Sequence, residues 1–193
     1  MTLILASGSS IRRKMLEDAG VEFEVVRPDI DEAPYKEGKP DLEVSGPSHA
    51  EAKAVSVSRD RPGDWVIGSD SVIAVDDRLF DKPSSRGEAA DHLRFFSEKR
   101  MTLLSAVVLA RDGSVEWGRF GRAELDVREL SEDFIQSYLE AEWPEVGNTV
   151  GVFRMEGRGV QLFETIAGGH FTILGMPLLP VLNQLRKRGL LQS

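Results

Sequence analysis

The beginning of the chain constrains the fold most, because a short apolar run leads through small polar residues into a helical pattern. Residues 3–6 read Leu-Ile-Leu-Ala, which is typical of a buried strand. Residues 7–10 are Ser-Gly-Ser-Ser, and such hydroxyl side chains cap helices by accepting hydrogen bonds from free backbone N–H groups. Apolar residues then recur at four-residue spacing, which predicts a helix over 11–19 that ends at Gly20. This strand, turn and helix order predicts an α/β fold.

The rest of the chain alternates in the same way, with hairpins in its middle. Strands are predicted over 23–26, 65–67, 72–75, 101–110, 115–127, 150–153 and 160–163. Helices are predicted over 49–57, 86–97, 132–141 and 178–188, and the Pro- and Gly-rich residues 28–48 are predicted to be irregular. The expected architecture is α/β, with a mixed central sheet and flanking helices. A length of 193 residues suits a single domain over 1–193.

Composition excludes several classes of function. The sequence contains no cysteine, which excludes disulfides, thiolate catalysis and zinc–thiolate sites. The formal net charge of −8 disfavours nucleic acid as a partner, because such a surface repels a polyanion. No apolar run approaches the roughly eighteen residues that cross a bilayer, so no membrane association is expected. The N-terminus lacks the pattern of a signal peptide, and a cytoplasmic location is therefore expected.

The loop that follows the first strand is a candidate anion site. Backbone N–H groups and the helix dipole favour a negative ligand at a helix start, and the hydroxyls of Ser7 and Ser9 can donate further hydrogen bonds. Arg12 and Arg13 add planar guanidinium groups that match phosphate. The loop is not a Walker A motif, because the Gly-Lys-Ser/Thr ending is absent. The pattern alone leaves two interpretations open: a phosphate site, or an ordinary helix start followed by solvated arginines.

Charged side chains elsewhere are also candidate functional residues, and each has an alternative interpretation without a function. Asp70 lies between two predicted strands, where it could hold a divalent cation, act as a general base, or simply bond its own turn. Lys82 precedes a proline and is therefore presented from an extended segment, although exposed lysines are usually just solvated. Glu32 lies in the irregular acidic segment. Glu156 is expected in a tight hairpin, either facing a base such as guanine or exposed on the surface.

Taken in order, these segments resemble the Maf family of nucleotide pyrophosphatases. The matching segments are Leu5 to Leu16, Ala50 to Ala54, Gly68 to Asp70, Asp81-Lys82-Pro83 and Gly175-Met176-Pro177-Leu178. Each motif is weak alone, but the ordered set spans nearly the whole chain and is specific. The resemblance implies an elongated, two-lobed, Ham1-like (ITPase-like) architecture with a central cleft, often assembled as a homodimer.

The resemblance also implies an activity and a set of site residues. The activity is hydrolysis of a nucleoside triphosphate between the α and β phosphates, which makes the protein a hydrolase of phosphorus-containing anhydrides. By position, the triphosphate would be held by Ser7, Ser9, Arg12, Arg13, Lys53 and Lys82. Asp70 would accept the proton of the attacking water, and Glu32 with Asp70 would hold a divalent Mg²⁺ or Mn²⁺ ion. An anionic substrate of this kind needs converging cations and electrostatic stabilisation.

Departures from the family pattern concern the base that is accepted. Ile11 stands where dTTP/UTP-cleaving members tend to carry arginine, Ser71 where they carry threonine, and Glu156 where they carry glutamine. Glu156 resembles the branch that cleaves 7-methyl-GTP, although Ser71 does not match that branch well. We therefore expect a pyrophosphatase outside the strict dTTP/UTP class, with purine or modified-purine substrates favoured. The alternatives are a dTTP/UTP pyrophosphatase and, in another class, a nucleotide-binding regulator of septum formation.

Overall fold

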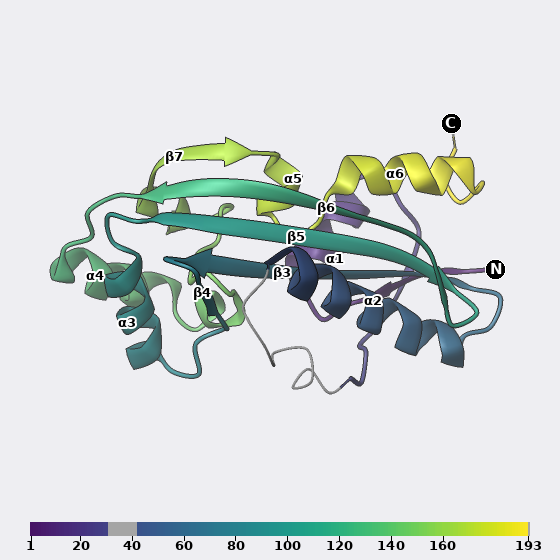
Figure 1. Cartoon of the computed structure of the whole chain (residues 1–193), viewed down its shortest axis with the longest axis horizontal. Helices are drawn as coiled ribbons and strands as arrows, with labels where there is room; N and C mark the ends of the chain where they lie inside the picture. Colours follow the sequence, from purple (N-terminus) through teal and green to yellow (C-terminus); the bar gives the residue numbers. More distant parts are fainter. Residues whose placement is uncertain (31–41, 193) are drawn as a thin grey trace. The chain divides into compact units, whose positions relative to one another are not determined.

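The computed structural model describes residues 1–30 and 42–192, and these residues form an α/β structure with a mixed sheet (Figure 1). The strands are β1 (Leu3–Ala6), β2 (Glu24–Val26), β3 (Trp65–Val75), β4 (Arg78–Phe80), β5 (Arg100–Arg111), β6 (Ser114–Val127) and β7 (Phe163–Gly168). Their order is β2-β1-β3-β5-β6-β7, with β4 paired to β3. β1 is parallel to both β2 and β3, whereas the β3–β4 and β6–β7 pairs are antiparallel. The predicted fold class is therefore confirmed.

Most predicted helices are present within a few residues of their expected bounds. The helices are α1 (Ser10–Asp18), α2 (Leu42–Asp60), α3 (Arg86–Phe96), α4 (Glu132–Glu142), α5 (His170–Ile173) and α6 (Leu178–Lys187), with the 3₁₀ turns η2 (Glu145–Asn148) and η3 (Arg158–Leu162). Serine side chains cap three of them: Ser9, Ser85 and Ser131 accept hydrogen bonds from the first turns of α1, α3 and α4. None of the helices in residues 1–30 and 42–192 combines the length and apolar content that crossing a bilayer requires.

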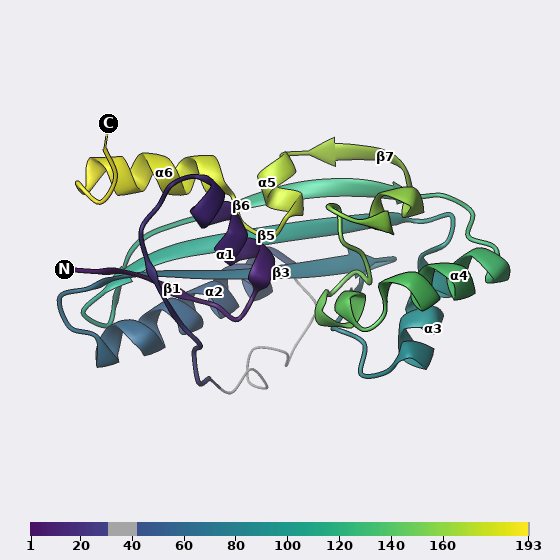
Figure 2. The ribbon, with the colours of Figure 1, turned by 180° about the vertical axis from the view of Figure 1, so that it is seen from behind.

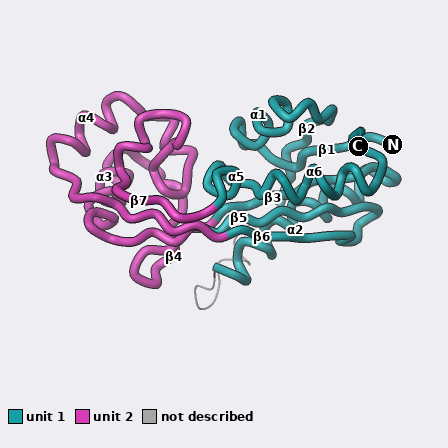
Figure 3. The backbone as a smooth tube through the Cα atoms, turned by 90° about the horizontal axis from the view of Figure 1, so that it is seen from above, with its two compact units in different colours: residues 1–71, 104–121, 169–193 teal, residues 72–103, 122–168 magenta. Residues whose placement is uncertain are grey.

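The chain divides into two compact units, which Figure 3 colours separately. The first unit contains residues 1–71, 104–121 and 169–193, and the second contains residues 72–103 and 122–168. The strands β3, β5 and β6 contribute residues to both units. The single domain expected over 1–193 stays a prediction.

In the first unit, helices cover both faces of the sheet, as the opposite views in Figures 1 and 2 show. On one face, Leu5, Ile67 and Leu109 pack in a core cluster with residues of α1 and α6 such as Met15 and Leu185. The other face carries α2. Because both faces are buried, β1 is apolar throughout, which is typical of a parallel strand between helices.

The contact between α2 and β3 is unusually close at Gly68. A Cβ atom on Gly68 would lie 2.2 Å from the Ala50 carbonyl oxygen and 2.8 Å from the Ala54 Cβ. Ala50 and Ala54 are fully buried. Only glycine in the strand, facing alanines in the helix, allows the two backbones to approach so closely.

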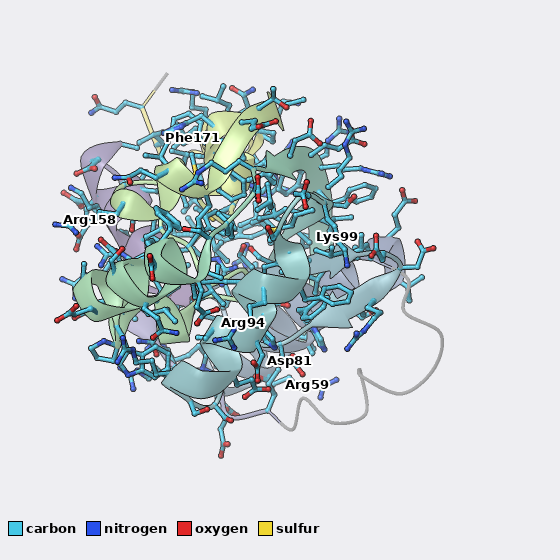
Figure 4. All side chains as sticks on the ribbon, turned by 90° about the vertical axis from the view of Figure 1, so that its left-hand side faces the viewer. Arg59, Asp81, Arg94, Lys99, Arg158 and Phe171 are labelled. Atoms are coloured by element: carbon cyan, nitrogen blue, oxygen red, sulfur yellow. The ribbon has the colours of Figure 1, made fainter. Side chains whose placement is uncertain are left out.

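In the second unit, α3 contacts both β4 and α4. Phe80 of β4 lies 4.8 Å from Phe96 of α3 between ring centroids, and Ile73 pairs with Phe80 in the β3–β4 ladder. On the surface, Arg94 of α3, labelled in Figure 4, donates two hydrogen bonds of 2.9 and 2.7 Å to the Glu132 carboxylate of α4. Exposed pairs of this kind contribute little stability, so the aromatic contacts matter more for this unit.

The structure corrects the predicted break in β3. Residues 68–71 were expected to interrupt two strands, but the strand is continuous over Trp65–Val75. Its polar side chains bond to other elements instead of turning the chain: Ser69 Oγ donates to the carbonyls of Ala106 and Gly175 at 2.7 and 3.0 Å. A polar strand is therefore stable here because distant partners satisfy it.

Four other expectations are wrong. α2 begins at Leu42, before the predicted residue 49, and it includes Pro47 within the segment that was expected to be irregular. Residues 150–153 are not a strand, because Val152 has a φ of 55°, outside the extended region. The strand expected over 160–163 is also misplaced, because residues 158–162 form η3 and the strand β7 begins only at Phe163. Glu156 consequently lies in a turn before η3 and not in a hairpin.

The close approach at Gly68 predicts a large effect of a small change. We expect Gly68→Ala to lower the free energy of unfolding by about 2–3 kcal/mol or more, because the added methyl group overlaps the backbone of α2. Gly118→Ala in β6 is the matched control, since its Cβ would lie no closer than 3.6 Å to other atoms. Urea unfolding of both variants measures the difference. Equal stabilities would contradict the role assigned to Gly68.

Candidate functional site

The candidate site of the first unit lies where β1 ends and β3 continues. The parallel register places Ala6 opposite Gly68, and β3 extends beyond that point with Ser69, Asp70 and Ser71. Val26, at the end of β2, is also opposite Ala6. The carboxyl ends of β1 and β2 therefore lie side by side, next to the middle of β3. The carboxyl ends of parallel strands are where α/β sheets commonly bind ligands.

Successive side chains of β3 point to opposite faces of the sheet at this edge. Ser69 and Ser71 contact the carbonyl of Gly175, which precedes α6. Asp70 contacts His49 and Lys53 of α2 on the other face. The alternation is the ordinary two-residue period of a strand, and it divides the candidate site into two groups of residues.

Arg12 belongs to the group on the Ser71 side and is held by two hydrogen bonds. Its Nε donates to the Gly175 carbonyl at 2.9 Å, and its Nη2 donates to Ser71 Oγ at 2.9 Å. Ser71 Oγ lies 2.8 Å from Ser105 Oγ, and Ser105 donates to the Thr172 carbonyl. Burial lowers the pKa of the Arg12 guanidinium, while the negative charge of Asp70 opposes that shift. The network fixes a guanidinium in the first turn of α1.

The loop before α1 has the local structure expected from its sequence. Ser7 Oγ accepts a hydrogen bond from the Ser9 backbone N–H at 3.2 Å, and Ser9 Oγ caps the helix by accepting from the Arg12 N–H. A hydroxyl that accepts such a bond can still donate its own proton to a phosphate oxygen. The first turn of α1 contains no acidic residue that would repel an anion.

Asp70 belongs to the group on the α2 side and is held from two directions. Lys53 Nζ donates to Asp70 Oδ1 at 2.6 Å, and His49 Nδ1 lies 3.1 Å from Asp70 Oδ2. The three side chains are largely buried, with exposed fractions of 13% for Lys53, 15% for Asp70 and 8% for His49. A charge-assisted contact in such surroundings is stronger than one in water.

These contacts determine the protonation state of Asp70. Burial raises the pKa of the carboxyl group, but the hydrogen bond from His49 and the charges of Lys53 and Arg12 outweigh it and lower the pKa to about 2. The side chain is therefore a carboxylate at neutral pH. An ionised carboxylate only accepts hydrogen bonds, so His49 donates through an Nδ1–H group.

The structure adds two residues to the predicted set. His49 escaped the sequence analysis, although it lies four residues before Lys53 on the same helix face, a spacing that brings side chains together. Arg27 follows β2, and its Nε lies 3.7 Å from the position of a Cβ built on Gly8. That arginine adds a cation beside the Ser7–Ser9 loop, which the parallel pairing of β1 and β2 could have indicated.

Other predicted residues are not brought into these contacts. Arg13 is exposed and pairs with Glu17 at 2.7 Å, one turn along α1. Ile11 lies in the first turn of α1. Lys82, next to the Asp81 labelled in Figure 4, and Glu156 belong to the second unit. Their roles, and the specificity role of Ser71, stay predictions.

The described residues do not by themselves provide a set of metal ligands. Glu32 lies outside the described residues, and both oxygens of Asp70 already contact Lys53 and His49. Within residues 1–30 and 42–192, no group of three or more His, Cys, Asp or Glu side chains could hold a metal ion. Carboxylate oxygens are the ligands that Mg²⁺ and Mn²⁺ prefer, so the predicted ion stays a prediction that depends on Glu32.

Comparison with known proteins agrees with the resemblance in the sequence. The chain is 45% identical over 191 residues to a 7-methyl-GTP pyrophosphatase of Rhizobium etli, covering 97% of this chain and 96% of the relative. It is 45% identical over 198 residues to a nucleoside triphosphate pyrophosphatase of Sphingopyxis alaskensis, covering 98% of each.

A solved structure is more distantly similar. The nucleoside-triphosphatase / dITP/XTP pyrophosphatase of Mycobacterium abscessus aligns with a TM-score of 0.45 and 18% identity, over 98% of this chain and 96% of that one. A similarity this distant does not bear on activity. The sequence model of the family described as Maf-like protein matches residues 2–188, and the chain belongs to that family.

Proposed function

We propose that the protein is a nucleoside triphosphate pyrophosphatase, which hydrolyses its substrate to a nucleoside monophosphate and pyrophosphate. The observation that carries the proposal is the arrangement around β3, where a fixed guanidinium and a lysine lie with an ionised carboxylate beside the carboxyl ends of β1 and β2. The names of the two relatives at 45% identity support the same reaction.

In the proposed reaction, the Ser7–Ser9 loop and Arg12 bind phosphate oxygens. Water attacks phosphorus, the anhydride bond between the α and β phosphates breaks, and the proton of the water passes to Asp70. The negative charge that develops on the phosphate oxygens is stabilised by the guanidinium of Arg12. Because Gly175 and Ser71 already hold Arg12, little reorganisation is needed when substrate arrives. A divalent ion held by Glu32 and Asp70 would supply further charge stabilisation.

Lys53 has two proposed partners in this reaction. Its ammonium group pairs with Asp70 at 2.6 Å, and the same group is predicted to bind the triphosphate. A bound triphosphate carries several negative charges and competes with Asp70 for the lysine. A shift of Lys53 toward phosphate would remove one of the contacts that lower the pKa of Asp70, which makes the carboxylate a better proton acceptor.

The preferred base is proposed to be a purine or a modified purine. Glu156 can accept hydrogen bonds from the ring N–H and amino group of guanine, and one of the relatives named above is a 7-methyl-GTP pyrophosphatase. A dTTP/UTP preference is the competing specificity. A regulator of septum formation without turnover is the competing class. A homodimer and a cytoplasmic location stay predictions from the sequence.

Replacing Asp70 tests the reaction. We expect Asp70→Asn to reduce pyrophosphate release by at least about 100-fold, because the amide cannot accept the proton of water. Nucleotide binding should change far less, because Arg12 and the loop keep their contacts. Initial rates of pyrophosphate formation and calorimetric titration with a non-hydrolysable triphosphate measure the two effects separately.

Asp60→Asn, at the exposed end of α2, is the control for loss of a negative charge in the same unit and should keep full activity. Unchanged catalysis by Asp70→Asn would remove Asp70 from its role. If the wild-type protein releases no pyrophosphate from any nucleotide, the regulator is favoured.

A substrate panel tests the preferred base. With Mg²⁺ or Mn²⁺, we expect higher kcat/KM for GTP or 7-methyl-GTP than for dTTP and UTP. Glu156→Gln should lower the ratio of kcat/KM for the guanine nucleotide to kcat/KM for dTTP or UTP by about 10-fold. The amide keeps only one oxygen acceptor for two donors of guanine, the amino group and the ring N–H. Turnover of dTTP and UTP alone would show that the specificity assigned to Glu156 is wrong.

A further inference from the structure

We propose that His49 is a positioning residue for the reaction, which holds the Asp70 carboxylate in place through Oδ2 while Lys53 engages the triphosphate. The inference rests on the proposed pyrophosphatase function, and it assigns a role to a side chain that the family motifs quoted above do not include. Its basis is that both carboxylate oxygens of Asp70 contact side chains from one face of α2.

The geometry gives each Asp70 oxygen its own partner. Lys53 contacts Oδ1 at 2.6 Å, and His49 contacts Oδ2 at 3.1 Å. Both partners come from α2, four residues apart, and the contact of α2 with Gly68 places that helix face beside Asp70. The His49 side chain is only 8% exposed, so its ring is fixed by packing and approaches the carboxylate from a defined direction.

Bound substrate is expected to displace Lys53 from Asp70 but not His49. Lys53 ends in a flexible ammonium group, and a triphosphate competes for that charge. The imidazole of His49 has fewer rotatable bonds and is buried, so it stays beside Asp70 when the lysine moves. A carboxylate with one remaining fixed donor keeps its orientation, and a reacting group misplaced by about 1 Å can lose about 100-fold in rate.

The test uses two substitutions of His49 in the full-length protein. His49→Leu removes the hydrogen-bond donor and introduces an apolar side chain of similar bulk. His49→Asn places an amide N–H group at the same bond distance from Cβ as Nδ1. With the nucleotide that the wild-type protein cleaves best, we expect kcat for pyrophosphate release to fall by about 10- to 100-fold in His49→Leu. KM should change by less than about twofold, and His49→Asn should recover most of the lost kcat.

Two controls separate positioning from a general loss of structure. His92→Leu replaces another partly buried histidine, in α3, that contacts a carboxylate at 3.8 Å, and it should keep the wild-type kcat. In an Asp70→Asn background, His49→Leu should cause no further loss of rate, because its only proposed effect acts through the carboxylate. Thermal unfolding of each variant establishes that the native state is populated during the assay.

The outcomes distinguish this role from the proposed function. An active wild-type protein with an unchanged kcat in His49→Leu overturns the role of His49 alone. A loss confined to KM, or no recovery in His49→Asn, overturns it as well. A wild-type protein that releases no pyrophosphate overturns the proposed function and, with it, the positioning role of His49.

Discussion

The packing of α2 against β3 at Gly68 is the constraint on which the first-unit site depends. A helix that lay one side chain further away could not bring Lys53 and His49 to Asp70, which lies two residues along the strand on the same face. Ala50 and Ala54 complete this contact from the helix side. The position of three ionisable groups is therefore determined by three residues with no functional group of their own.

The site is also unusual in placing its polar residues within a strand rather than in a loop. Ser69, Asp70 and Ser71 are each satisfied by partners from other elements, so the strand stays regular where its sequence is typical of a turn. A carboxylate on a paired strand has less freedom than one on a loop. That rigidity suits a group that must meet water and phosphorus in a defined geometry.

The local features of this chain could be predicted, and its long-range contacts could not. The first strand, the Ser9 cap and the helix that carries Arg12 follow from neighbouring residues alone. The continuity of β3 could not be predicted, because the bonds that satisfy Ser69 and Asp70 come from residues far along the chain. His49 was missed for a related reason, since a lone histidine on a buried helix face is usually part of the core. The strand expected over 150–153 failed because valine and phenylalanine favour strands only where a partner strand exists.

The alternation of β3 gives its neighbouring polar residues separate hydrogen-bond partners. Asp70 and Ser71 are adjacent in sequence, yet one contacts α2 and the other contacts Arg12 and Gly175. Substitutions of Ser71 or Ser69 therefore leave the hydrogen bonds of Asp70 to α2 in place, whereas Arg12 and Asp70 stay coupled through their charges. An insertion or deletion of one residue in this strand would have a larger effect than any of these substitutions. It would move each side chain to the opposite face of the sheet and place the carboxylate against the arginine network. The strand therefore tolerates substitutions but not a change of register.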